Sequence, residues 1–145
     1  MATLVVASVG ILGANAVMLS YLSDVEARGC SCATRPVQFR AVKAFAIIAI
    51  VYTTLATMAR LGDGAGLLPA GFRSYTRVLD MTVAVASLVV HGAALRWVDR
   101  VSRGDCVCSD DPRRKFVWAW SAVAIPAVVA AALLTGTGAG AGQGG

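Results

Sequence analysis

Residues 106–134 read CVCSDDPRRKFVWAWSAVAIPAVVAAALL, and this stretch decides the fold class. Its second part, residues 116–134, contains no charged side chain. A helix of about 20 apolar residues spans the hydrocarbon core of a bilayer, and a helix satisfies its backbone hydrogen bonds internally. We therefore predict a transmembrane helix that follows a turn with two cysteines and a basic run.

The rest of the chain contains three more apolar stretches of this kind, at residues 2–22, 37–59 and 78–98. The 145 residues are 57% hydrophobic and only 14% charged, whereas ordinary soluble domains have about 25% charged residues. A soluble chain this short could not bury so much apolar surface. The expected fold is one all-α integral membrane domain over residues 1–145, with four transmembrane helices arranged as two tandem hairpins.

The two ends of the chain carry further expectations. Residues 2–22 lack the positively charged start of a signal peptide and exceed its usual apolar length, so we expect a retained first helix. Residues 135–145 are almost all Gly, Ala and Thr. That composition is typical of a flexible tail with nothing to pack.

All four cysteines fall in two matching turns. Residues 30–36 are CSCATRP and residues 106–112 are CVCSDDP, so both read Cys-x-Cys-x-x-x-Pro between two apolar stretches. This repetition indicates a duplicated hairpin. Two hairpins in series have the same orientation, so we expect both turns at one membrane face. Thr34 and either Asp110 or Asp111 are candidate N-caps for the helices that follow.

The positive charges predict which face that is. Of the 13 Lys and Arg residues, only Arg60, Arg73 and Arg77 lie on the side away from the cysteines. Because Lys and Arg are enriched in cytoplasmic connections, we expect both turns in the cytosol and both termini opposite. The net charge is +5, and the basic residues lie between the apolar stretches. This placement favours lipid headgroups or acidic proteins over nucleic acid as partners. The candidate basic patch consists of Arg35, Arg40, Lys43, Arg113, Arg114 and Lys115.

Four thiols at one face leave three alternatives open. Disulfides that join Cys30 or Cys32 to Cys106 or Cys108 are less strained than a bond within one Cys-x-Cys. Such a crosslink stabilises by about 2–4 kcal/mol. The four could instead bind zinc, although structural zinc sites usually have two to four residues between paired cysteines. They could also remain free thiols, the usual state in a reducing cytosol.

The second turn resembles a motif of small membrane proteins from nucleocytoplasmic large DNA viruses. Those proteins read Cys-x-Cys-Ser-acidic, then two variable residues, then Arg-basic-aromatic and a hydrophobic span. Cys106–Asp111 and Arg113–Phe116 match this pattern, and the apolar helix with Trp118 follows. Pro112 departs from it, because the family usually has an aromatic or other residue there.

The first turn is a degenerate copy, in which Ala33 replaces the serine and Thr34 the acidic residue. The resemblance implies a virion component embedded in, or docked on, the internal membrane beneath a capsid shell. Its partners would be capsid or other membrane proteins, with the cysteine turns facing the cytosol or capsid. It also implies a viral thiol oxidase, which would permit disulfides in that compartment.

The sequence contains no catalytic or cofactor-binding constellation, so we expect a structural or assembly protein rather than an enzyme. Asp80 and His91 are the ionisable residues of the third span. We expect Asp80 near the interface beside Arg77, and His91 hydrogen-bonded to a carbonyl or hydroxyl of a neighbouring helix. The alternatives are an accessory subunit of a cellular membrane complex, or a membrane thiol–disulfide oxidoreductase. Such oxidoreductases normally carry Cys-x-x-Cys within a span, unlike these turns.

Other side chains in the spans are expected to act in packing and membrane placement. Pro126 should kink the fourth helix or open its backbone hydrogen-bond ladder. The polar residues expected to hold helices together are Ser8, Asn15, Ser20, Thr82 and Ser87. The residues expected to form an aromatic belt at the interfaces are Tyr21, Tyr75, Trp97, Trp118 and Trp120.

Overall fold

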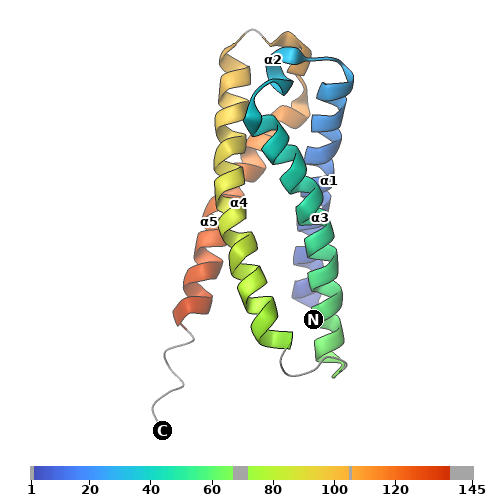
Figure 1. Ribbon diagram of the computed structural model, residues 1–145, viewed down its shortest axis with the longest axis vertical. Coiled ribbons are helices and arrows are strands. Elements are labelled where there is room, and N and C mark those ends of the chain that lie inside the picture. The colour runs from blue at the N-terminus through green and yellow to red at the C-terminus, as the bar shows by residue number, and fades with distance from the viewer. Residues whose placement is uncertain (1, 67–71, 105, 138–145) are drawn as a thin grey trace.

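The computed structural model describes residues 2–66, 72–104 and 106–137, and Figure 1 shows them as a bundle of long helices. The four long helices are α1 (Ala2–Ala27), α3 (Val37–Gly64), α4 (Phe72–Arg103) and α5 (Pro112–Thr137). Two short helical turns carry the cysteine pairs, α2 (Ser31–Thr34) and the 3₁₀ turn η1 (Val107–Ser109). Within these ranges there is no strand, so the all-α prediction is confirmed.

Each long helix contains a segment that is long and apolar enough to cross a membrane. These segments are Val5–Ala27, Val37–Gly64, Tyr75–Arg103 and Pro112–Leu133. Four helices long and apolar enough to span a membrane are therefore present, as predicted, but the helices continue past the predicted boundaries. They do so because the polar residues that flank each apolar stretch extend the backbone hydrogen-bond ladder. The predicted tail begins inside α5, and its residues 138–145 lie outside the described part of the chain.

Helix packing is strongest at the end that carries the cysteines. α1 packs along α3, α5 packs along α4, and α3 also contacts α4. Figure 1 shows the helices close together beside α2 and spread apart toward the opposite end. The main buried cluster lies at the same closed end, where residues from α1, α2, α3, α4 and α5 meet.

Gly29 ends α1 and directs the chain into the first cysteine turn. Its φ of 66° lies in the left-handed region that favours glycine. The amide of Gly29 donates to the Glu26 carbonyl at 2.9 Å, and the amide of Cys30 donates to the Val25 carbonyl at 3.3 Å. This pair of bonds is the Schellman arrangement, in which a hydrophobic contact between its ends packs the turn against the helix. Cys30 and Val25 both belong to the buried cluster.

The helix that follows each turn begins at or beside its proline, but the two starts differ. Pro112 is the first residue of α5, and Asp111 Oδ1 accepts the amide of Arg113 at 2.8 Å as an N-cap. Pro36 is the residue before α3, and no side chain caps that helix. Thr34, a predicted cap, instead donates its hydroxyl to the Cys30 carbonyl at 3.0 Å. The cap prediction is therefore right for Asp111 and wrong for Thr34.

The predicted aromatic belt is wrong for Tyr21 and Trp97. Both side chains are only 1% exposed and lie inside the bundle, whereas Tyr75 and Trp118 point outward at 63% and 52% exposure. Burial is favourable for the first two because each donates a hydrogen bond to a backbone carbonyl inside the bundle. The remaining belt residue, Trp120, is half-buried.

Polar side chains connect the helices at fewer places than predicted. Ser8 of α1 accepts a hydrogen bond from Thr57 of α3 at 2.8 Å, and Ser20 of α1 accepts one from Arg113 of α5 at 3.2 Å, so both make the expected contact between helices. His91 Nδ1 lies 3.2 Å from the Ser121 hydroxyl of α5, as predicted for a histidine beside a neighbouring helix. Asn15 instead donates to Ile11 of its own helix. α5 is one helix that contains Pro126.

Candidate functional site

The two cysteine turns face each other at the closed end of the bundle. Cys30 is bonded to Cys108 and Cys32 to Cys106, with Cα–Cα distances of 5.9 and 6.1 Å. Both bonds join one turn to the other. The sequence favoured such bonds over a bond within one Cys-x-Cys because they are less strained. The Sγ atoms of Cys32 and Cys108, which are not bonded to each other, are 3.7 Å apart. All four sulfur atoms thus form one compact group.

The pairing is reversed between the two copies of the motif. Cys30 and Cys106 are the first cysteines of their turns, and each is bonded to the second cysteine of the other turn. If the two turns exchanged places, the same two bonds would result. The turns are therefore related to each other as two equivalent faces of a dimer are.

Two buried aromatic side chains repeat this reciprocal arrangement. The Tyr21 hydroxyl of α1 donates to the Ser109 carbonyl at 2.8 Å, and Trp97 Nε1 of α4 donates to the Ala33 carbonyl at 2.8 Å. Tyr21 and Trp97, like Ala33 and Ser109, are separated by the same 76 positions as Cys32 and Cys108. Each repeat therefore sends an aromatic donor to the residue after the second cysteine of the other repeat.

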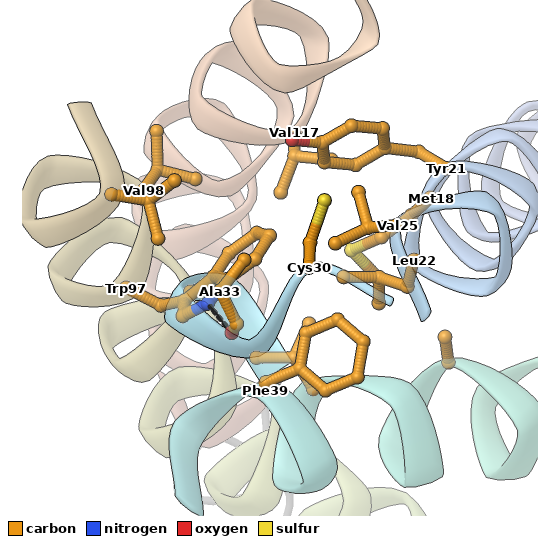
Figure 2. Close-up of a cluster of buried hydrophobic side chains, with 14 of the residues drawn as sticks. Met18, Tyr21, Leu22, Val25, Cys30, Ala33, Phe39, Trp97, Val98 and Val117 are labelled. Carbon is orange, nitrogen blue, oxygen red and sulfur yellow. Dashed lines mark hydrogen bonds between the residues drawn. The ribbon is translucent and has the colours of Figure 1, made fainter. Parts of the chain in front are cut away.

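Figure 2 shows how the first turn sits within the buried cluster. Cys30 lies among side chains of α1, and Trp97 reaches Ala33 along the dashed hydrogen bond. Phe39 packs beside Trp97, with ring centroids 5.7 Å apart. The turn is thus held by apolar packing as well as by sulfur and hydrogen bonds.

Arg113 adds an ionic connection between α1 and the second turn. Its Nη2 atom lies 2.7 Å from Asp24 Oδ2 and 2.9 Å from Asp111 Oδ2, and its Nη1 atom donates to Ser20 Oγ at 3.2 Å. The guanidinium carbon also lies 5.8 Å from the ring centroid of Tyr21, which adds a cation–π contact. Arg113, which the sequence placed in the basic patch, therefore makes several contacts within the chain itself.

Asp111 has an unusual acidity as a result. The side chain and backbone amide of Arg113 both donate to its carboxylate, which lowers the pKa of Asp111 from 3.8 to about 2. Hydrogen bonds to the charged form of a carboxyl favour that form. Asp111 therefore remains ionised across the whole physiological pH range.

The predicted basic patch divides into paired and unpaired members. Arg113 pairs with Asp24 and Asp111, Arg114 with Asp110, and Lys43 with Glu26. Within the described residues, no ion pair involves the three remaining members, and all three are exposed: Arg35, Arg40 and Lys115. These three members of the patch are therefore exposed and make no ion pair within the described residues.

The opposite end of the bundle holds a second polar group, which includes a contact that the sequence did not predict. Asp80, which was expected near the interface beside Arg77, forms a two-oxygen ion pair with Arg60 of α3 at 2.9 Å and accepts a hydrogen bond from Tyr52. Continuation of α3 through Arg60 brings that side chain beside α4. The three residues border a hollow of about 190 Å³ between α3 and α4.

The sulfur group is also the place where the described residues could hold a metal ion. The Sγ atoms of Cys32, Cys106 and Cys108 all lie within 4.8 Å of one another. Thiolate groups of this kind suit zinc. Zinc binding would therefore use the same sulfur atoms that form the disulfides.

No protein-family model, curated protein or solved structure matches the chain.

The reciprocal hydrogen bonds can be tested by removing each donor. We predict that Tyr21→Phe and Trp97→Phe each lower the free energy of unfolding by about 1–3 kcal/mol, since each leaves a buried carbonyl without its donor. Trp97→Phe should lie at the upper end because it also leaves a space. Thermal unfolding in detergent micelles, followed by circular dichroism, measures both. Tyr75→Phe, at an exposed position, is the matched control and should change nothing.

The disulfides should stabilise in a non-additive way. The first bond closes a loop of 74 or 78 residues, whereas the second then closes only a very short one. Loss of both bonds should therefore cost about 2–4 kcal/mol, and loss of either pair alone much less. Melting temperatures of Cys30→Ser/Cys108→Ser, Cys32→Ser/Cys106→Ser and the fourfold serine variant test this. Equal and additive losses for the two pairs would be inconsistent with it.

The Asp111 ion pairs predict a pH-dependent stability. A carboxyl with a lowered folded pKa stabilises fully above its unfolded pKa, and this contribution disappears as the pH falls through the folded pKa. Asp111→Asn keeps a capping side chain but loses the charge. The variant should melt below wild type at pH 7, and the difference should shrink between about pH 4 and about pH 2. Asp99→Asn, which removes only an exposed ion pair within α4, should show almost no loss.

Proposed function

We propose that this chain is a multi-pass membrane protein with a structural or assembly role, which anchors protein layers to a bilayer through its cysteine-bearing face. The four long helices would insert as two tandem hairpins. The observation that carries the proposal is the contrast between the sides of the bundle and its closed end. The sides are apolar and exposed, whereas the closed end is crosslinked and basic.

The exposed apolar side chains support membrane insertion. Large aliphatic residues are more than half exposed along all four helices, including Val6, Leu55, Val89 and Leu133. Apolar area left in water costs about 25 cal/mol per Å², and soluble proteins rarely expose large contiguous apolar patches. Lipid removes that cost. The same helices satisfy their backbone groups internally, as a membrane requires.

The closed end supports a docking role because it is both rigid and positively charged. Two disulfides, two buried hydrogen bonds and the Arg113 ion pairs hold the turns together. Around them, Arg35, Arg40 and Lys115 are exposed. A preorganised surface loses little conformational entropy on binding. An acidic protein surface is the partner that this charge favours.

The viral resemblance makes the proposal more specific. In such a virus the chain would be a minor capsid or inner-membrane protein, with the cysteine turns facing the cytosol and the capsid shell. A cellular accessory subunit would use the same face toward a different assembly. Both versions predict a protein partner at the basic end.

The positions of the lysines allow a direct test of that partner. The chain has only two lysines, Lys43 and Lys115, and both lie near the cysteine-bearing turns. Partner peptides that an amine-specific crosslinker joins to either lysine, in intact particles or native membranes, therefore report contacts at this end. We expect peptides of partner proteins on Lys115 in particular, because its side chain is exposed.

Lys115→Arg is the matched control, because it keeps the charge and removes the reactive amine. It should lose the Lys115 crosslinks and keep the association. Replacing Arg35, Arg40 and Lys115 together by Gln should release the chain from the assembly without changing its detergent extraction from membranes. Recovery of the wild-type chain as an uncrosslinked monomer under the same conditions would contradict the proposal.

A thiol–disulfide oxidoreductase is the competing proposal, favoured by the 3.7 Å between the unbonded sulfur atoms of Cys32 and Cys108. Disulfide exchange requires a third sulfur atom near a disulfide. Replacing Cys106 and Cys108 by Ser would abolish turnover of a dithiol substrate if this alternative holds. Under the assembly proposal there is no turnover to lose.

A further inference from the structure

The four cysteines that form the two disulfides could have a different role in their reduced form. We propose that, after both disulfides are reduced, Cys30, Cys32, Cys106 and Cys108 bind one Zn²⁺ ion as a tetrathiolate site. The two turns would then be joined by the metal instead of by sulfur–sulfur bonds. This inference does not rest on the proposed anchoring role.

The spacing of the sulfur atoms fits such a site. With Zn–S bonds of about 2.3 Å, the sulfur atoms of a tetrahedral site are about 3.8 Å apart. The Sγ atoms of Cys32 and Cys108 are 3.7 Å apart, and those of Cys32, Cys106 and Cys108 all lie within 4.8 Å of one another. Cys30, which is bonded to Cys108, supplies the fourth ligand. Cys30 lies outside the group of three, so its side chain has to move after reduction for all four sulfur atoms to surround one ion.

The short Cys-x-Cys spacing does not prevent this geometry. Structural zinc sites usually have two to four residues between paired cysteines, whereas each pair in this chain has only one. Cys106 and Cys108 nevertheless bring their sulfur atoms within 4.8 Å, because the 3₁₀ turn η1 bends the chain between them. The ligands are divided between two turns, so each turn has to supply only two of them.

The turns are held in place by contacts that do not involve sulfur. The hydrogen bonds from Tyr21 to Ser109 and from Trp97 to Ala33 anchor each turn at the residue beside its second cysteine. Arg113 also connects the second turn to α1. These contacts remain when the disulfides are reduced, so the four thiols stay close to one another. Ligands already near their bound positions favour metal binding.

The site is both enclosed and reachable. Cys30 and Cys106 are 2% and 8% exposed, whereas Cys32 and Cys108 lie at the surface. A reductant and an ion can therefore approach from the outer side. A tetrathiolate zinc site carries two negative charges. Most of the 13 Lys and Arg residues lie toward the end of the bundle that carries the cysteines. That excess of positive charge favours the loaded, negatively charged site over four neutral thiols.

Reduction of the two disulfides requires a dithiol reductant. Two dithiol molecules of the thioredoxin type each reduce one disulfide and become disulfides themselves, which delivers four electrons and four protons to the four sulfur atoms. Zn²⁺ then displaces the four thiol protons into solvent. The zinc ion is not oxidised or reduced. A reducing compartment, where disulfides are rare, would thus convert one kind of connection into the other.

The experiment uses the full chain in detergent micelles. The protein is prepared metal-free, once with its disulfides intact and once after reduction with a phosphine under argon. Zn²⁺ is added in competition with a chromophoric chelator, and bound zinc is counted by elemental analysis. We expect one Zn²⁺ per reduced chain and none per oxidised chain. Co²⁺ in place of Zn²⁺ should give the absorption bands of a tetrahedral thiolate site.

Two variants make the outcome decisive. The fourfold cysteine-to-serine variant should bind no Zn²⁺, and circular dichroism verifies that it remains helical. Cys32→Ser alone, after reduction, should weaken Zn²⁺ binding by about 100-fold or more, since even residues that merely orient ligands cost about 10–100-fold. Equal Zn²⁺ binding by the fourfold variant would overturn the proposal, as would no binding by the reduced wild type. Selective loading with iron instead of Zn²⁺ would overturn the choice of metal.

Discussion

The reciprocal docking of the two cysteine turns is the interaction on which the rest of the structure depends. Each turn accepts a buried aromatic hydrogen bond from the other repeat, and each contributes one first and one second cysteine to the shared sulfur group. Because the contacts are reciprocal, neither turn can leave its place without disturbing the other. The buried cluster is assembled around this point. The helices then extend away from this point and spread apart toward the opposite end (Figure 1).

This arrangement divides the molecule into two parts with different properties. At the closed end, covalent bonds, hydrogen bonds and the Arg113 ion pairs act together, so the surface has a fixed shape and a fixed distribution of charge. Toward the other end, α3 and α4 enclose a hollow beside Arg60 and Asp80. Helices that expose apolar side chains on most faces gain little from one another and much from lipid. The proposed anchoring role would use this combination of an apolar set of helices and a crosslinked closed end.

The sequence predicted the helices well because long apolar stretches have few alternatives. It also predicted disulfides across the turns, as one of three alternatives, from the strain within a single Cys-x-Cys. It placed Tyr21 and Trp97 wrongly in an aromatic belt, since position near a span end does not reveal which way a side chain points. Their common separation of 76 positions, equal to that of Cys32 and Cys108, was the signal that would have linked them to the cysteines. The pairing of Asp80 with Arg60 depends on how far α3 continues, which composition alone does not determine.

The most direct test of reciprocal docking is the disulfide connectivity of the native chain. Both bonds join the same two turns, so partial reduction, stepwise alkylation and fragment mass spectrometry are needed to separate them. Reciprocal docking predicts Cys30 with Cys108 and Cys32 with Cys106. A bond within one turn, or Cys30 with Cys106 and Cys32 with Cys108, would contradict it, because neither pattern arises from two turns that face each other in reversed order.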